Sequence, residues 1–105
     1  MAHSKTDLFA ADEIRLATLA KALAHPARVA ILKILAERNE CLCGEIVEGL
    51  PLAQATVSQH LKELKDAGFI TSEVDGLKVC YCLNLKVVRE WQTLVQSFTT
   101  TLKAP

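Results

Sequence analysis

The sequence predicts a small, mainly α-helical domain that carries one β-hairpin. The chain has 105 residues, half of them apolar, which fits one domain with a modest core. Apolar residues recur at three- and four-residue spacing along most of the chain, which predicts helices. Two β-rich runs, FITSEV and LKVCYCL, flank Asp75-Gly76, and an Asp-Gly pair between such runs predicts a tight hairpin.

The first half of the chain predicts two helices and a short extended stretch. The first helix covers about residues 6–24 and ends before His25-Pro26, because proline is disfavoured inside a helix but favoured at its first position. A second helix therefore runs from Pro26 to near Asn39. We expect one brief strand around Cys41-Leu42.

The centre of the chain predicts a helix-turn-helix over residues 44–67, made of a short helix at 44–49 and a longer one from Ala53 to Ala67. Gly68 then supplies a C-terminal glycine. The hairpin, at about 69–83, follows as a wing, and a last helix covers about 86–103. The predicted fold is thus a winged helix-turn-helix in the order α-α-(β)-α-α-β-β-α.

The outer face of the longer helix is polar and suits a DNA major groove. Val57, Leu61 and Leu64 share the opposite, apolar face. Amide, hydroxyl and ammonium groups can contact bases or phosphates. We expect DNA contacts from Gln54, Ala55, Thr56, Ser58, Gln59, His60 and Lys62, and from Lys78 in the wing. The alternative is a solvated helix face.

His60 is a special case within this set, because it lies toward the flank of the helix. A histidine hydrogen-bonded inside the domain is the favoured interpretation, and a DNA contact or a relay between sensor and reading helix is the alternative.

Charge and composition limit the other functions. Twelve basic and twelve acidic residues give zero formal charge, which argues against a polybasic tail but permits a local basic patch. No apolar run approaches the roughly 20 residues that span a bilayer, so we expect a cytosolic protein with reduced thiols. The chain lacks Cys-x-x-Cys and a βαβ pattern, so we expect no enzyme such as a thiol oxidoreductase. A winged helix that binds protein is a further alternative.

The stretches ALAHPARVAILKILAE and ATVSQHLKELKDAGFITSEVDGLKVCYCLN resemble the ArsR/SmtB family of winged-helix repressors, and the resemblance covers about residues 15–98. It implies a homodimer through the first and last helices, which binds operator DNA and is released by an inducer, often a metal or metalloid ion. It also implies that Arg28 lies near DNA, with a surface salt bridge as the alternative. The wide apolar arcs of the two helices independently favour a dimer, and two-fold symmetry favours a pseudopalindromic operator.

The four cysteines form two Cys-x-Cys pairs, Cys41/Cys43 and Cys80/Cys82. Residues two apart on a strand share a face, and thiolates are soft metal ligands. In winged-helix folds the segment before the third helix commonly pairs with the second wing strand. The four thiols would then converge, as a metal site of three or four thiolates or as cross-strand disulfides. Simple burial of small apolar side chains is the remaining alternative.

Comparison with the family leaves this site incomplete. Cys41-Leu42-Cys43 resembles the Cys-x-Cys of arsenic-, antimony-, cadmium- and lead-responsive members, but Ile46 stands where some arsenic sensors have a further cysteine. We expect Cys80 or Cys82 to supply the missing ligand, rather than His3. Residues 86–105 contain neither Asp nor His, which excludes the zinc- and nickel-type site on the last helix. The expected inducer is As(III), Sb(III) or Cd(II), with thiol oxidation or persulfide sensing as the alternative.

Overall fold

A computed structural model describes residues 8–38, 41–44 and 50–103 of the chain. Its elements, in chain order, are α1 (Ala11–Ala22), α2 (Pro26–Arg38), α4 (Gln54–Ala67), β1 (Ile70–Asp75), β2 (Lys78–Leu83) and α5 (Leu85–Thr101). The helix predicted at 44–49 falls on residues 45–49, which lie outside the described part, so it stays a prediction.

Local chemistry explains where the helices begin and end. Helix α1 begins at Ala11 rather than near residue 6, because the Glu13 carboxylate accepts a hydrogen bond of 2.9 Å from the Ala10 N–H and caps the first turn. Helix α2 begins at Pro26, as predicted. Helix α4 ends at Gly68, whose φ of 99° is a left-handed conformation that glycine adopts without a steric penalty.

The core lies where α1, α2 and α4 meet the base of the hairpin. Its members share low exposure; the largest fully buried side chains are Phe69, Leu19, Ile31, Leu35, Leu64, Ile70 and Val57. The predicted inner face of α4 is confirmed, since Leu61 is buried as well. Phe69 meets Trp91 of α5 edge to face, with ring centroids 6.1 Å apart. Val29 of α2 lies outside this core and is 44% exposed.

The hairpin is confirmed, and a third segment joins it. Strands β1 and β2 pair in antiparallel register from Ile70↔Leu83 to Asp75↔Lys78, so Gly76 and Leu77 form the loop. Leu42 adds an isolated antiparallel bridge to Tyr81, and both of its backbone hydrogen bonds measure 2.9 Å. The extended stretch expected around Cys41-Leu42 therefore pairs with the second wing strand.

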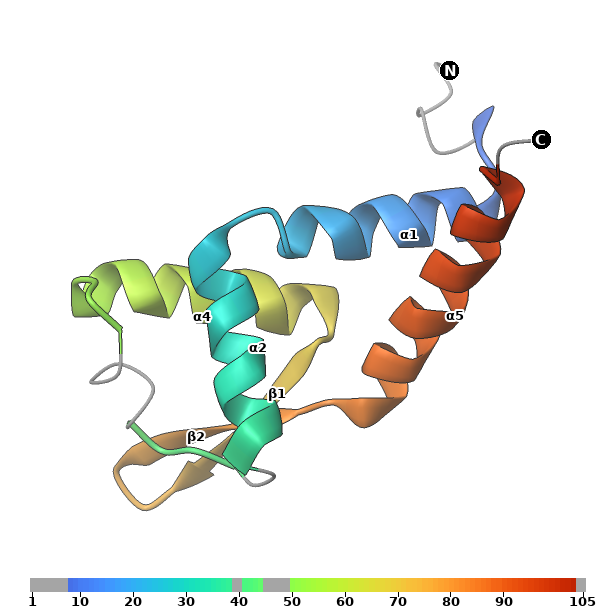
Figure 1. The fold of residues 1–105 in the computed structure, drawn as a ribbon. Coiled ribbons are helices and arrows are strands. Elements are labelled where there is room, and N and C mark those ends of the chain that lie inside the picture. The colour runs from blue at the N-terminus through green and yellow to red at the C-terminus, as the bar shows by residue number, and fades with distance from the viewer. Residues whose placement is uncertain (1–7, 39–40, 45–49, 104–105) are drawn as a thin grey trace, which may run out of the picture.

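Figure 1 shows α1 and α5 meeting near the two ends of the described chain, away from the hairpin. The hairpin lies on the side of α4 and α2 opposite to α1. No residue of α5 is buried, although the helix carries an apolar stripe. None of the described helices is long and apolar enough to cross a membrane.

Candidate DNA-binding surface and thiol cluster

The four cysteines form two disulfides on either side of the Leu42–Tyr81 bridge. Cys41 is bonded to Cys82 and Cys43 to Cys80, with Cα separations of 4.3 and 4.1 Å. An antiparallel bridge between residues 42 and 81 places 41 opposite 82 and 43 opposite 80, so the backbone register dictates this pairing. We call these four residues the thiol cluster.

Exposure within the thiol cluster is graded. Cys80 is buried, Cys43 and Cys82 are half-buried, and Cys41 is exposed. In this disulfide form, no group of three or more His, Cys, Asp or Glu side chains in the described ranges could hold a metal ion. An ion would therefore need the reduced thiols. Ile46, where a further thiol was sought, lies outside the described residues.

The polar face of α4, which we call the reading face, is open to solvent as predicted. Its members Gln54, Ala55, Thr56, Ser58, Gln59 and Lys62 are all exposed, and so is Lys78 of β2. Two of them are paired along the helix: Gln59 donates to Glu63 at 3.0 Å, and Lys62 donates to Asp66 at 2.8 Å. The hydrogen bond to Asp66 raises the pKa of Lys62. DNA binding would have to exchange these two contacts for contacts to bases or phosphates.

His60 does not belong to the solvent-exposed reading face, because it is buried, with only 6% of it exposed. Its Nδ1 accepts a hydrogen bond of 3.1 Å from Arg28 Nε, and its ring lies 4.2 Å from that of His25. Burial is the largest cause that lowers the pKa of His60, and the nearby His25 and Arg28 add to it. The interior interpretation of this histidine is confirmed.

Arg28 makes structural contacts that the sequence did not predict. Besides its bond to His60, its Nη1 donates to the carbonyl oxygens of Lys21 and Ala22 at 3.3 and 3.4 Å. The alternative role, a surface salt bridge, is not seen among the described residues, and the guanidinium instead caps the C-terminal carbonyls of α1. Arg28 thus joins the ends of α1 and α2 to the middle of α4.

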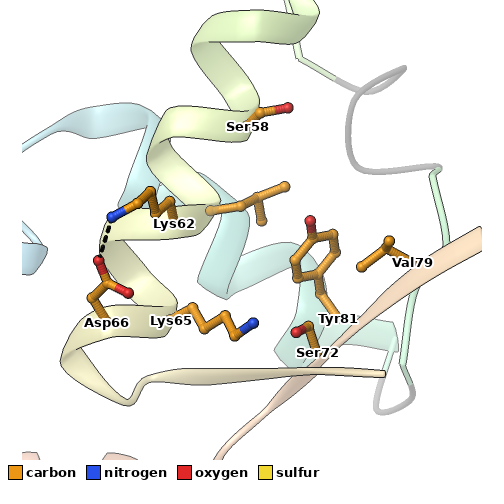
Figure 2. A pocket seen from close by; sticks show the side chains of 8 residues that line it. Ser58, Lys62, Lys65, Asp66, Ser72, Val79 and Tyr81 are labelled. Carbon is orange, nitrogen blue, oxygen red and sulfur yellow. Dashed lines mark hydrogen bonds and ion pairs between the residues drawn. The ribbon is translucent and has the colours of Figure 1, made fainter. Parts of the chain in front are cut away.

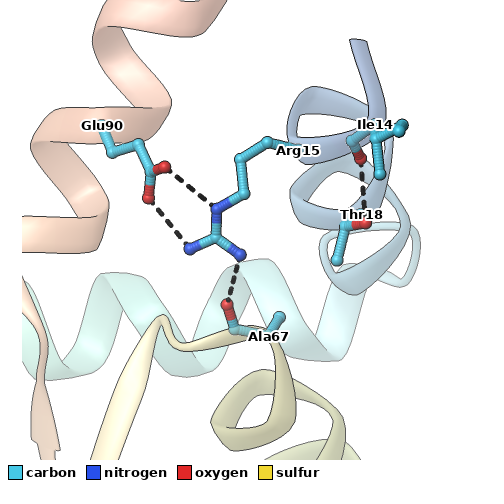
Figure 3. Close-up of polar contacts among 5 residues, drawn as sticks. All are labelled: Ile14, Arg15, Thr18, Ala67 and Glu90. Carbon is cyan, nitrogen blue, oxygen red and sulfur yellow. Dashed lines mark hydrogen bonds and ion pairs between the residues drawn. The ribbon is translucent and has the colours of Figure 1, made fainter. Parts of the chain in front are cut away.

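A second contact ties α4 to the helices at the other end of the molecule. Figure 3 shows Arg15 of α1 in a two-pronged ion pair with Glu90 of α5, at 3.0 and 2.9 Å, and Arg15 Nη1 also donates to the Ala67 carbonyl at 3.4 Å. The hydrogen bond between them raises the pKa of Arg15 and lowers that of Glu90. Nothing in the helical periodicity marked this pair, which joins residues 75 positions apart.

The structure also brings together residues that the sequence analysis did not select. A cleft of about 300 Å³ separates α4 from the hairpin, and we call it the α4–hairpin cleft. Figure 2 shows Lys65, Ser72 and Tyr81 around it, with Ser58 and Lys62 on the helix side. Alternation along β2 could have identified Tyr81, because it lies between Cys80 and Cys82 and so faces the opposite side of the strand.

A solvent-exposed polar helix beside a β-hairpin, both carried on a helical core, defines a winged helix-turn-helix of the kind found in DNA-binding regulators. A family model for a helix-turn-helix domain matches residues 23–73. The chain belongs to the ArsR/SmtB family, whose members are DNA-binding transcriptional regulators and not enzymes.

Three similar proteins support this assignment. The "HTH-type transcriptional repressor SmtB" of Mycobacterium tuberculosis is 48% identical over 65 residues, which are 62% of this chain and 47% of that protein. The "Arsenical resistance operon repressor" of Staphylococcus xylosus is 36% identical over 69 residues, 66% of this chain and 65% of that one. The crystal structure of the transcriptional regulator HlyU from Vibrio vulnificus has a TM-score of 0.63 at 32% identity, covering 83% of this chain and 90% of that chain. The chain spans about half the length of the mycobacterial repressor.

Proposed function

We propose that this protein is a transcriptional repressor that binds a pseudopalindromic operator as a homodimer and is released when its thiol cluster changes state. The observation that carries the proposal is the convergence of all four cysteines around the Leu42–Tyr81 bridge. This bridge joins the segment that leads into the helix-turn-helix to the second strand of the wing. A chemical event there acts on two parts that contact DNA.

The inducer that we propose first is As(III), Sb(III) or Cd(II), bound by the reduced thiolates. The cross-strand Cα separations of 4.1 and 4.3 Å place all four sulfurs in one patch. Three of them could meet one soft ion with small side-chain rotations, since metal–thiolate bonds are about 2.3 Å long. The similarity to a staphylococcal arsenical-resistance repressor supports the same choice.

The second candidate is thiol oxidation, and the two disulfides themselves favour it. With a hydroperoxide as oxidant, a thiolate attacks the peroxide oxygen and an alcohol leaves, which gives a sulfenic acid. The opposite thiol then displaces water and closes the disulfide. Each pair loses two electrons and two protons in all. Exposed Cys41 is the accessible first thiol, and half-buried Cys82 is its resolving partner.

The dimer would form along α1 and α5. A groove between them is lined by apolar side chains that include Leu16, Leu94 and Phe98. Phe98 is 47% exposed in the single chain, and a buried dimer interface would remove this apolar surface from water. Two-fold symmetry would then set two copies of α4 about one DNA turn, ~34 Å, apart.

Fluorescence anisotropy of an operator duplex, selected by the protein from a random library, tests the proposal. With the reduced protein we expect arsenite to weaken binding by about 5- to 150-fold, the range of a typical allosteric coupling. Single Cys→Ser variants identify the ligands, and Thr71→Ser, at an exposed position of the same hairpin outside the α4–hairpin cleft, is a control. If arsenite leaves the affinity unchanged but a hydroperoxide lowers it, the oxidation candidate holds. If neither reagent changes the affinity, the thiol cluster is not the sensor.

A further inference from the structure

We propose that the α4–hairpin cleft is a binding site for a DNA backbone phosphate, held by the Lys65 ammonium group and the Tyr81 hydroxyl group. Neither residue belongs to the reading face. The inference rests on the proposed DNA-binding function and adds a specific place where the sugar-phosphate strand sits.

The geometry of DNA requires a strand at this place. If α4 lies in the major groove, about 12 Å wide, the adjacent hairpin reaches the neighbouring minor groove or its edge. The sugar-phosphate strand that divides these two grooves must then cross between helix and hairpin. It carries one negative charge about every 3.4 Å, so at least one phosphate faces the α4–hairpin cleft.

The charges in the cleft favour an anion. Lys62 and Asp66 both line it, but they neutralise each other in an ion pair of 2.8 Å. Lys65 is the remaining cation, and it makes no ion pair with any residue in the described part of the chain. Figure 2 shows its ammonium group extending from α4 toward Ser72 and Tyr81 of the hairpin, not out along the helix.

The hairpin side of the cleft supplies hydroxyl donors. Tyr81 and Ser72 are half-buried, and strand pairing fixes their backbone, because Ser72 lies opposite Tyr81 in the register. Tyr81 also bridges to Leu42 through two backbone hydrogen bonds. The hydroxyl of Tyr81 has no hydrogen-bond partner among the residues that the structure describes, so it is free to donate to a phosphate oxygen. One ammonium and hydroxyls on an opposed rigid strand form a common arrangement for phosphate contact.

The position of Tyr81 links this site to the thiol cluster. Tyr81 stands between Cys80 and Cys82 on β2, and alternation along the strand sends its side chain to the opposite face from theirs. The cysteines on one face hold residues 41–43, while Tyr81 on the other face lines the cleft. Any shift of β2 that accompanies a change in the thiols therefore moves a wall of the phosphate site.

The test measures the affinity of reduced protein for the selected operator and for an unrelated duplex, over a series of salt concentrations. Lys65→Gln should lower the affinity for both duplexes by a similar factor. It should also reduce the slope of log affinity against log salt by about 1.8, because the dimer loses one phosphate contact, worth about 0.9, in each copy. Lys65→Arg should restore the slope. Tyr81→Phe should weaken both complexes several-fold and leave the slope unchanged, because it removes no charge. Lys103→Gln, at an exposed position beyond the end of α5, is the matched control.

Three outcomes would overturn the inference. If Lys65→Gln matches Lys103→Gln in affinity and slope while the wild-type protein binds the operator, the proposed function stands and the cleft has no part in it. If inorganic phosphate at low millimolar concentration shifts the NMR signals of Tyr81 in the free protein, the cleft is a site for free phosphate instead. If the wild-type protein binds neither duplex, the proposed function itself fails.

Discussion

Helices α4 and α5 both carry an apolar stripe, but only α4 buries it within the single chain. Val57, Leu61 and Leu64 of α4 are at most 3% exposed, whereas no residue of α5 is buried. Helix α4 is held by the core and by buried His60, while α5 is held by the edge contact of Trp91 and the ion pair of Glu90. The comparison indicates that α4 needs no partner for its apolar face, and that the apolar stripe of α5 stays accessible in the single chain, where the proposed second copy would cover it.

The largest difference between the two helices is expected from a matched pair of leucine-to-alanine substitutions, one in each helix. Leu64→Ala removes a fully buried side chain, and we expect it to lower the free energy of unfolding by about 2–5 kcal/mol. Leu94→Ala removes the same atoms from a half-buried position of α5 and should cost about 1 kcal/mol in dilute protein. Urea denaturation followed by circular dichroism measures both. Equal losses would mean that α5 belongs to the core as fully as α4 does.

A charge placed in the groove between α1 and α5 tests the idea that this stripe receives a second copy. Leu94→Asp should weaken self-association by at least tenfold, roughly 1.4 kcal/mol or more, because the carboxylate must lose its water in the interface. Sedimentation velocity measures the change. Gln92→Asp, exposed on the same helix and outside the groove, should leave self-association unchanged. A wild-type protein that is monomeric at all concentrations would contradict the dimer.

The burial of α4 should also make the stability of the domain depend on pH, because α4 carries the buried titratable side chain of His60. Its folded pKa lies below the ordinary value of about 6.5, so between the two values the unfolded chain binds more protons. The stabilisation of the folded state by neutral His60 is therefore complete above about pH 6.5, and it is lost as the pH falls below that value. Denaturation midpoints between about pH 7 and pH 5 should show this fall, and His60→Gln should reduce it. An unchanged pH dependence in the variant would assign the fall to other groups.

The ion pair between Arg15 and Glu90 should have the smallest effect, because both side chains are about a third or more exposed. Arg15→Ala should cost about 0.5 kcal/mol at low salt, and less as salt is raised. Since the pKa of Glu90 is lowered, this stabilisation is present above the ordinary glutamate pKa and is lost as the pH falls through the folded value. Thermal melts at two salt concentrations check it, with Arg89→Ala as an exposed control. A larger loss than that of Leu94→Ala would contradict the ranking.

Local signals predicted the elements of the fold. Pro26 and Gly68 mark helix ends, Asp75-Gly76 marks the hairpin, and the alternation of cysteines predicted that they share a strand face. These features depend on near neighbours in sequence, so one sequence contains them. The expected pairing of residues 41–43 with β2 came from what is common in winged-helix folds.

Contacts between distant elements could not be predicted in the same way. Arg15 reaches Glu90, and Arg28 reaches His60 and the end of α1, only because of the angles at which the helices pack. The periodicity of a helix predicts which of its faces is apolar. It does not predict which polar side chains of two different helices will contact each other. Lys65 was missed for that reason, since the α4–hairpin cleft exists only once the hairpin folds back beside α4.

The two disulfides have a topological consequence for how a loss of DNA binding is interpreted. The Cys41–Cys82 disulfide spans 41 positions of the sequence and the Cys43–Cys80 disulfide spans 37. The oxidised chain therefore contains a covalent ring that includes α4 and β1. Closing a ring of this size removes unfolded conformations worth about 4 kcal/mol, and the second, nested link adds less. Oxidation thus makes the domain harder to unfold. If a hydroperoxide abolishes operator binding, denaturation of the helix-turn-helix is the wrong explanation, and a rearranged native state is the one to look for.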